Sequence, residues 1–573
     1  KDGVPGAGSP LEYREAVTER VVTSSFRATQ APTQEQMPRK RPARAEHDRT
    51  QPDGGGPGGP LPLLIPVALA GGIALLTLTA RVSANPLLTR AFLGAAGFVG
   101  LWTAVLALRG GAPGRAVEST VRPQHWIQAC CQLAVLLYWG WYWRPVYDMA
   151  VLFAAQLAFA YAFGMLLRWT RGERYGLGFG PVPIIFSINL FLWFRDDWFW
   201  LQFLMIGVGF LGKELVQWQR DGRRVHVFNP SAFALGLFSL VLIATGTTEL
   251  TWGREIASTL TLAPNIYLYL FLVGLVVMHF FAITLIAGTA AAVLFGLSAA
   301  WSAWSGVPYF VDSEIPAAVF LGLHLLVTDP STSPRTPTGK AIFGGLYGVG
   351  VFALYALLGA FGAPTFYDKL LCVPLLNLSV RGIDGLVRRL RPGAVAAVAG
   401  VTAGSARLLA PVGRVNLAHM AVWIAFFATM TALGRTDGRH PGDALPFWEE
   451  ACAEGRPTAC ERLVSIESTY CRDNSAWACN ELGIHYRTGR VVEADAELGA
   501  EYFARACELR FQPACLNLLA PDRALRTDPR TLDLRLLLRE GGLNLMEMPE
   551  SELLARACEH AWGFACDRLA AAS

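Results

Sequence analysis

The chain has 573 residues, of which 53% are hydrophobic and 16% are charged. Soluble domains carry about 25% charged residues, so the composition excludes an ordinary soluble protein. The charge deficit lies between residues 61 and 434 and predicts a polytopic membrane protein with soluble ends. The formal net charge of +4 is too small and too dispersed to favour nucleic acid as a partner.

The N-terminal tail, residues 1–60, is rich in Pro, Gly, Arg, Thr and Gln and lacks apolar periodicity. We expect it to be disordered, although an arm that binds a partner is the alternative. Its basic cluster, between Arg39 and Arg49, favours a cytoplasmic N-terminus by the positive-inside rule. The expected location is the inner membrane of a bacterium.

Apolar runs of spanning length predict about thirteen transmembrane helices and therefore an all-α fold. They begin near Leu61, Leu87, Trp126, Tyr147, Phe179, Asp197, Pro230, Pro264, Phe281, Glu314, Ala341, Tyr367 and Leu417. Two extra helices occupy residues 61–110, ten more occupy residues 123–390, and a basic loop and the last helix fill residues 391–435. Most alternate loops are basic, so thirteen spans place the C-terminus outside the cell membrane.

Eight of the eleven cysteines follow residue 450 as four pairs, each separated by eight positions. On one continuous helix eight residues rise about 12 Å, which is too far for a disulfide. We therefore expect each bond to join the end of one helix to the start of the next across a turn. The expected bonds join Cys452 with Cys460, Cys471 with Cys479, Cys507 with Cys515, and Cys558 with Cys566. Because disulfides persist in oxidising compartments, this domain is predicted to be periplasmic; the spacing does not fit a zinc site.

The stretch from Cys479 to Cys507 resembles a Sel-one-like repeat, a relative of the tetratricopeptide repeat. Leu482-Gly483, Tyr486, Gly489 and the closing Ala506-Cys507 carry the likeness. The resemblance implies an α-solenoid of helical hairpins over residues 445–573 that binds a periplasmic protein.

Two polar breaks interrupt the apolar core, and each contains a proline. The first contains Asn229 and Ser231 around Pro230, and the second contains Thr328 and Asp329 before Pro330. Unsatisfied polar groups at membrane depth cost several kcal/mol, so these side chains must cap freed backbone groups, bond to each other's loops or contact a ligand. His226 and His324 flank the breaks and are either packed residues or ligand contacts.

Spans three to twelve resemble the D subunit of the Rnf electron-transport complex and the related B subunit of the sodium-pumping NADH:quinone reductase. The likeness rests on Val225–Phe233, on Phe320-Leu321-Gly322 through Thr328-Asp329-Pro330, and on Phe343–Gly348. Within that superfamily the chain is most similar to the short UnbU-like members. The resemblance implies a ten-helix domain in a complex with other subunits, with FMN, riboflavin or quinone at His226, Asn229, Ser231, His324, Thr328 and Asp329.

Members of that family carry a flavin phosphate on the last Thr of a Ser/Thr-Gly-Ala-Thr motif. This chain has Thr245-Gly246-Thr247-Thr248 in a loop predicted to lie outside. The resemblance implies a covalent flavin at Thr248, but Ala has become Thr and the usual upstream acidic residue is missing. A hydroxyl-rich helix end is the alternative interpretation.

No catalytic set, metal site, haem motif or iron–sulfur motif is visible, and Cys130, Cys131 and Cys372 are too few for a cluster. The first functional hypothesis is therefore a redox subunit that relays electrons through flavin or quinone. The second is a non-catalytic membrane scaffold that anchors the repeat domain. The third is a small-molecule or ion transporter, but a pore needs polar side chains buried at mid-span, and the predicted spans contain few.

Overall fold

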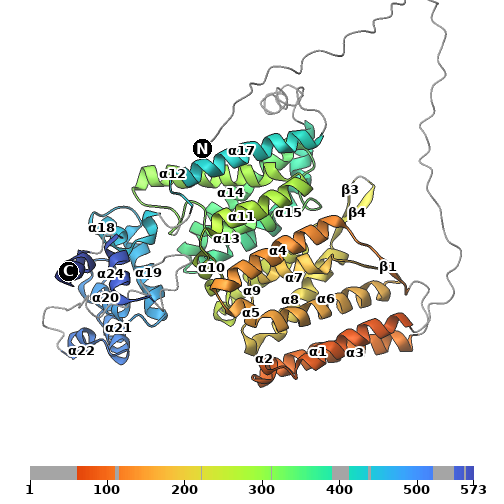
Figure 1. Cartoon of the computed structure of the whole chain (residues 1–573), viewed down its shortest axis with the longest axis horizontal. Coiled ribbons are helices and arrows are strands. Elements are labelled where there is room, and N and C mark those ends of the chain that lie inside the picture. Colours follow the sequence, from red (N-terminus) through yellow and green to blue (C-terminus); the bar gives the residue numbers. More distant parts are fainter. Residues whose placement is uncertain are drawn as a thin grey trace, which may run out of the picture. The chain divides into compact units, whose positions relative to one another are not determined.

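The computed structural model describes residues 61–109, 115–220, 222–311, 313–389, 412–436, 440–519, 548–559 and 563–572. The predicted N-terminal tail, the basic loop after residue 390 and the segment 520–547 fall outside these residues. The described part is mostly helical and contains almost no sheet, as expected for an all-α fold (Figure 1).

The apolar part of the described chain contains thirteen helices of nine or more residues, each starting within a few residues of a predicted span. They are α1 (Leu64–Leu76), α3 (Pro86–Leu108), α4 (Pro123–Tyr142), α6 (Ala150–Thr170), α7 (Pro181–Asn189), α8 (Trp200–Leu215), α9 (Pro230–Ala244), α11 (Ile266–Phe281), α12 (Thr284–Ser305), α13 (Ala317–Leu325), α14 (Pro337–Ala360), α15 (Asp368–Arg389) and α17 (Val412–Ala432). Short helices lie between them: α2 (Ala80–Ser83), α5 (Pro145–Asp148) and α10 (Gly253–Thr259).

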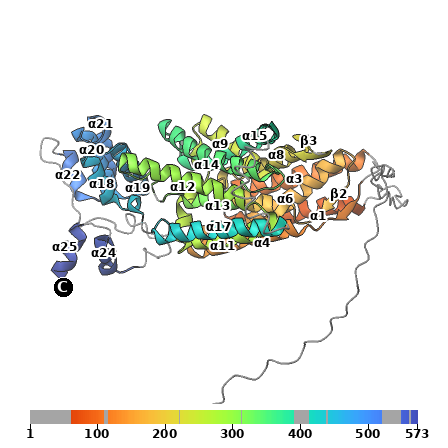
Figure 2. The ribbon, with the colours of Figure 1, turned by 90° about the horizontal axis from the view of Figure 1, so that it is seen from above.

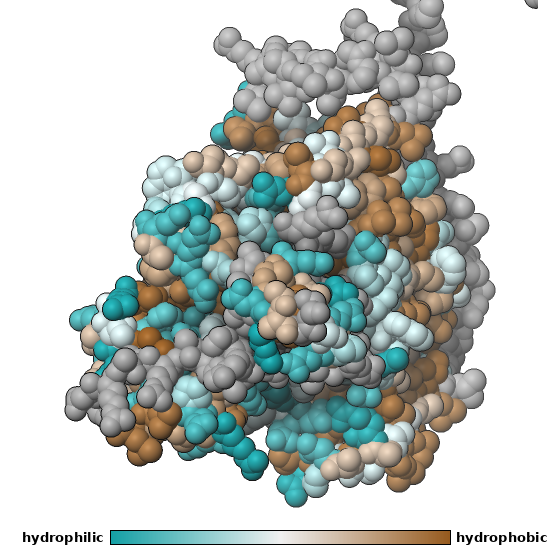
Figure 3. Space-filling model, turned by 60° about the vertical axis from the view of Figure 1, so that its left-hand side comes forward, coloured by the Kyte–Doolittle hydropathy of each residue, from teal (hydrophilic) through white to brown (hydrophobic). Residues whose placement is uncertain are grey.

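Six helices in the described part are long and apolar enough to cross a membrane, and the pair α10–α11, bent by 100°, is either a seventh, broken span or a re-entrant loop. Helices α7 and α13 have nine residues each, roughly 14 Å, or half of a hydrocarbon core about 30 Å thick. Large apolar side chains such as Leu101, Trp304 and Val422 remain about 70% exposed on the outside of the helices. Figure 3 shows hydrophobic surface gathered on one side of the face in view. These features support a helical, membrane-associated protein.

Two small sheets lie among these helices. Strand β1 (Val117–Ser119) pairs in parallel with β2 (Tyr175–Leu177), and β3 (Gln217–Arg220) pairs antiparallel with β4 (Arg223–His226). Gly222 supplies the positive φ of 76° that the β3–β4 turn requires. The hairpin therefore leads the chain from the end of α8 to His226 and into α9.

The C-terminal domain is a set of helical hairpins with its own hydrophobic core, in which Trp448, Ala478 and Cys479 are fully buried. Its helices are α18 (Leu445–Ala453), α19 (Ala459–Arg472), α20 (Ala476–Thr488), α21 (Ala496–Glu508), α22 (Gln512–Leu519), α24 (Glu550–Glu559) and α25 (Gly563–Ala572) (Figure 2).

All four predicted disulfides are present in this domain, with Cα–Cα distances of 4.6–4.8 Å. In each bond the first cysteine is the last but one residue of its helix, and the second lies within the first four residues of the next helix. The bonds are Cys452 to Cys460, Cys471 to Cys479, Cys507 to Cys515, and Cys558 to Cys566. Cys471 and Cys479 are buried, whereas Cys460, Cys515 and Cys566 are half-buried. The expected arrangement, in which each bond spans a turn between two helices, is confirmed.

Candidate functional site

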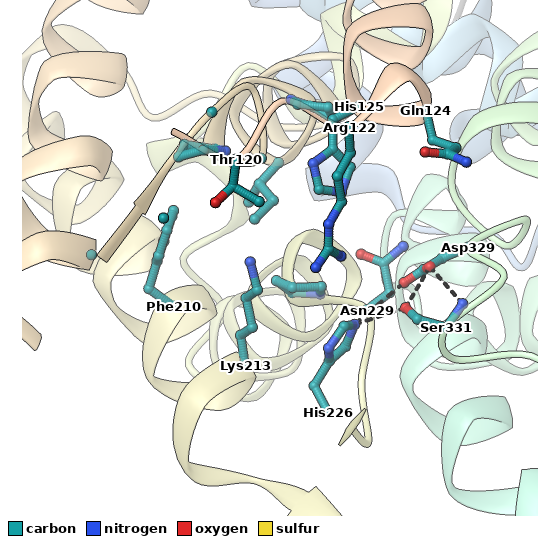
Figure 4. Close-up of a pocket in the computed structure, with 18 of the residues that line it drawn as sticks. Thr120, Arg122, Gln124, His125, Phe210, Lys213, His226, Asn229, Asp329 and Ser331 are labelled. Atoms are coloured by element: carbon teal, nitrogen blue, oxygen red, sulfur yellow. Dashed lines mark hydrogen bonds and ion pairs between the residues drawn. The ribbon is translucent and has the colours of Figure 1, made fainter. Parts of the chain in front are cut away.

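A cavity of about 1020 Å³ lies where β1 leads into α4, β2 leads into α7, and α8, β4 and the start of α9 meet the loop after α13. Four predicted site residues line it: His226, Asn229, Ser231 and Asp329. Figure 4 shows three of them, His226, Asn229 and Asp329. The two polar breaks, about a hundred residues apart in sequence, therefore meet at one wall of a single cavity.

Asn229 joins the two breaks. Its side-chain oxygen caps α9 by accepting hydrogen bonds from the Ser231 and Ala232 N–H groups, and its Nδ2 donates to the Leu326 carbonyl at 3.0 Å. Asn229 is only 7% exposed. Its polar atoms are thus satisfied by protein, which favours the capping interpretation for this residue.

Asp329 organises the second break. Its carboxylate accepts hydrogen bonds from the N–H and Oγ of Ser331, at 2.9 and 2.6 Å, and lies 3.6 Å from His226 Nε2. Burial raises the pKa of Asp329, but the contacts with His226 and Ser331 lower it by more, so the net pKa is about 2. The carboxylate is therefore ionised at neutral pH and adds negative charge to this wall.

The Ser331, His226 and Asp329 side chains do not form a nucleophilic triad. Ser331 Oγ lies 2.9 Å from His226 Nε2, and the Asp329 carboxylate faces the same ring nitrogen. In a triad the carboxylate binds the opposite nitrogen and the serine gives up its proton to the histidine. Here Ser331 donates to Asp329 instead, so the arrangement fixes the loop.

Asn377 on α15, which sequence reasoning missed, completes the link between the breaks. Its oxygen accepts from Asn229 N–H at 3.0 Å, and its Nδ2 donates to the Thr332 carbonyl at 3.2 Å. It is a polar residue, 1% exposed, on an otherwise apolar helix face, and that pattern is a signal that could have found it.

The cavity also contains basic side chains that were not singled out from the sequence. Arg122 and Lys213 point into it (Figure 4). The lining acids Glu214 and Glu118 are paired with Arg168 at 3.0 Å and Arg174 at 2.7 Å. Within the described residues, Arg122 and Lys213 form no ion pair with a carboxylate. The cavity thus offers the donor groups of a guanidinium and an amine to a ligand with acceptor atoms.

Part of the lining is aromatic and flat. Phe210, Tyr175, Phe280 and Phe281 all border the cavity. A cavity of roughly 300–1000 Å³ that combines apolar walls with a few convergent polar groups is typical of cofactor and small-molecule sites. Its size and lining fit a fused or single aromatic ring with acceptor atoms.

The other three predicted site residues lie elsewhere. His324 is 1% exposed, with Nδ1 2.7 Å from the Phe320 carbonyl, and packs against Gly274 and Trp423. Thr328 donates to the His324 carbonyl at 2.6 Å and so ends α13. Thr248 follows the opposite end of α9 from Asn229, roughly 22 Å away along a 15-residue helix. None of the three lines the cavity.

Buried amides form a polar cluster between α4, α6, α7 and α8, although the predicted spans contain few polar residues. Asn189 Nδ2 donates to Gln156 Oε1 at 2.7 Å, and Gln202 Nε2 reaches the same oxygen at 3.3 Å. Gln132 donates to Ser187, which also lines the cavity, at 2.7 Å. These residues are at most 3% exposed, and Ser187 places the polar cluster beside the cavity.

Comparison with known protein families, with curated proteins and with solved structures found no match.

Proposed function

We propose that this chain is a membrane subunit of an electron-transport complex of the Rnf D or Nqr B type. It would bind a flavin or a quinone in the cavity beside the two breaks. The observation that carries the proposal is the meeting of both predicted breaks at a cavity that has aromatic walls and two basic side chains without an ion pair in the described part of the chain.

The residues of the chain would have distinct roles. The linked breaks would hold the cavity wall in place, because the side chains of Asn229 and Asp329 form hydrogen bonds with other groups of the protein. Arg122 and Lys213 would stabilise negative charge on the ring or on a phosphate. Phe210 and Tyr175 would pack on its apolar surface. The redox chemistry would be supplied by the bound ring.

The same proposal includes the topology. Thirteen spans, counting the half-length helices α7 and α13, would place the N-terminus in the cytoplasm and the cystine-linked domain in the periplasm of a bacterial inner membrane. The helical hairpins of that domain would form a Sel-one-like solenoid that binds a periplasmic subunit.

The test is to purify the full chain in mild detergent, record its absorption spectrum, and extract and weigh any bound flavin or quinone by mass spectrometry. Lys213→Met and Arg122→Gln should each lower ligand retention about tenfold, because each removes one charge-assisted contact. Arg388→Gln, an exposed basic residue on α15 outside the cavity, is the control. A wild-type chain without chromophore or quinone would favour the scaffold, in which the core only anchors the repeat domain.

A transporter is a second candidate because of the buried amide cluster. Asn189 and Gln202 both donate hydrogen bonds to Gln156. Gln202 in turn accepts one from the backbone N–H of Phe194. Such groups could pass a small polar solute. Uptake into proteoliposomes that Asn189→Leu abolishes, with no bound chromophore, would support this function.

A further inference from the structure

A second hollow, of about 700 Å³, lies between α3, α6 and α8. Residues of α3 that line it recur every three or four positions from Leu87 to Trp102 and so form a stripe along one face of the helix. Fifteen residues of helix rise roughly 22 Å, so this groove runs along most of one membrane helix. We call it the α3 groove.

The walls of the α3 groove are apolar and aromatic. Phe98 and Trp102 lie 6.4 and 5.3 Å, centroid to centroid, from Phe163 on α6. Phe203 on α8 borders the groove too, with its ring 5.2 Å from that of Phe159. A channel of this length and composition fits an alkyl chain and offers a polar ligand no partners along its walls.

Opposite charges stand at one end of the groove, where α3 and α8 begin. Arg90 and Asp197 both line that end. Neighbouring Asp196 is fully engaged by Arg81, with two contacts of 2.7 Å, whereas Asp197 receives only the Asn85 amide on Oδ1. Across the described residues, neither Arg90 nor Asp197 forms an ion pair. The mouth therefore presents a separate positive and negative charge.

We propose that the α3 groove binds a phospholipid with an ammonium headgroup, of the phosphatidylethanolamine type. An acyl chain fills the groove, the phosphate binds Arg90, and the primary ammonium donates to Asp197. Phosphatidylcholine lacks N–H donors for Asp197, and phosphatidylglycerol lacks the positive charge, so the mouth selects against both. The bound lipid joins α3 to the helices α6 and α8, independently of what the inner cavity holds.

Two glycines of α3 give a matched test of the chain-binding part. A Cβ at Gly94 or at Gly97 meets no atom within 4 Å, so both positions accept a larger side chain, but only Gly94 lines the groove. Native mass spectrometry of the full chain from nanodiscs of mixed phosphatidylethanolamine, phosphatidylglycerol and phosphatidylcholine counts the retained lipids. Gly94→Leu should lower retained phosphatidylethanolamine about tenfold, and Gly97→Leu should leave it unchanged.

Charge variants test the headgroup part in the same nanodiscs. Arg90→Gln should weaken retention of every phospholipid, and Asp197→Asn should remove the preference for phosphatidylethanolamine while leaving total lipid retained. Equal retention by Gly94→Leu and Gly97→Leu would overturn the proposal. Equal retention of the three lipids by wild type, or the recovery of a quinone or free fatty acid from the groove, would overturn it as well.

Discussion

The cystine-linked domain and the inner cavity are stabilised in different ways. In the domain, every disulfide joins cysteines eight positions apart. Beside the cavity, Asn229 in the first break bonds to Leu326, 97 positions away, and to Asn377 on α15, 148 positions away. The first constraint is local and covalent, whereas the second exists only when the whole membrane part has folded. A substitution in the cystine-linked domain should therefore destabilise only nearby helices, whereas one at the linked breaks should destabilise the membrane part as a whole.

The largest effect should come from Asn229→Leu. The change removes the cap of α9 and leaves the Leu326 carbonyl without its donor. Loss of the cap costs about 1 kcal/mol, and each buried polar group left unpaired costs about 1–3 kcal/mol. We therefore expect the free energy of unfolding to fall by about 2–4 kcal/mol, measured as a lower unfolding temperature in detergent.

Ser239→Ala is the control on the same helix. Ser239 is fully buried but donates only to the Leu235 carbonyl one turn earlier, so its loss should cost at most about 1 kcal/mol. Equal losses for the two variants would mean that the link between the breaks contributes nothing.

Removal of one disulfide should have the next largest effect, and it should stay within its domain. Cys471→Ser with Cys479→Ser opens a short loop and should cost roughly 2–3 kcal/mol. Limited proteolysis should then cleave near α19 and α20 while the membrane helices stay intact. Cys130→Ser, which alters a free cysteine, is the control. Free thiols at the eight positions in non-reducing mass spectrometry would contradict the disulfide assignment.

The same contrast explains what the sequence could predict. Cysteine spacing, helix starts and the two breaks are patterns within short stretches, and the structure agrees with them for the described residues. The cavity draws Arg122 and Lys213 from segments far apart in sequence, and Asn377 on α15 bonds to Asn229 beside it. No local pattern marks these residues as neighbours. Asn229 and Thr248, which the sequence offered as separate candidates, lie at opposite ends of α9.

His324 shows a further limit of sequence reasoning. Its position beside the second break predicted a ligand contact or a packed residue. The structure packs it against Gly274, where an added Cβ would lie 1.9 Å from the imidazole. The direction of a side chain around a helix of only nine residues is set by tertiary packing, which the motif alone does not encode.

A smaller, pH-dependent effect is expected in the C-terminal domain. His485 Nε2 lies 3.0 Å from the Glu467 carboxylate. Burial lowers the pKa of His485, but Glu467, together with the charges of Glu481 and Glu449, raises it more, so the net shift is upward. Protonated His485 therefore stabilises the folded domain, fully at pH values below about 6.5. This contribution is lost as the pH rises through the raised pKa.

The raised pKa of Glu467, due mainly to burial, acts in the same direction at lower pH, since the folded state keeps that proton longer. The unfolding temperature of the domain should therefore fall as pH rises past neutrality. His485→Gln should flatten that part of the profile; an unchanged profile in the variant would contradict the pairing.

The smallest effect on stability is expected for Thr248→Ala. Thr248 lies in a partly exposed turn after α9, where substitutions usually change stability by less than about 0.5 kcal/mol. If a flavin is attached there, in-gel fluorescence of the denatured chain should vanish in Thr248→Ala and persist in Thr247→Ala. Fluorescence retained by Thr248→Ala would refute this attachment site.

The most direct test of the central claim is an experimental density map of the purified chain at the cavity lined by Lys213, His226 and Asp329. The electron-transport account predicts planar density for a ring system between Phe210 and the two basic side chains. Density for lipid chains alone, or for solvent alone, in a chain that retains its fold would contradict it.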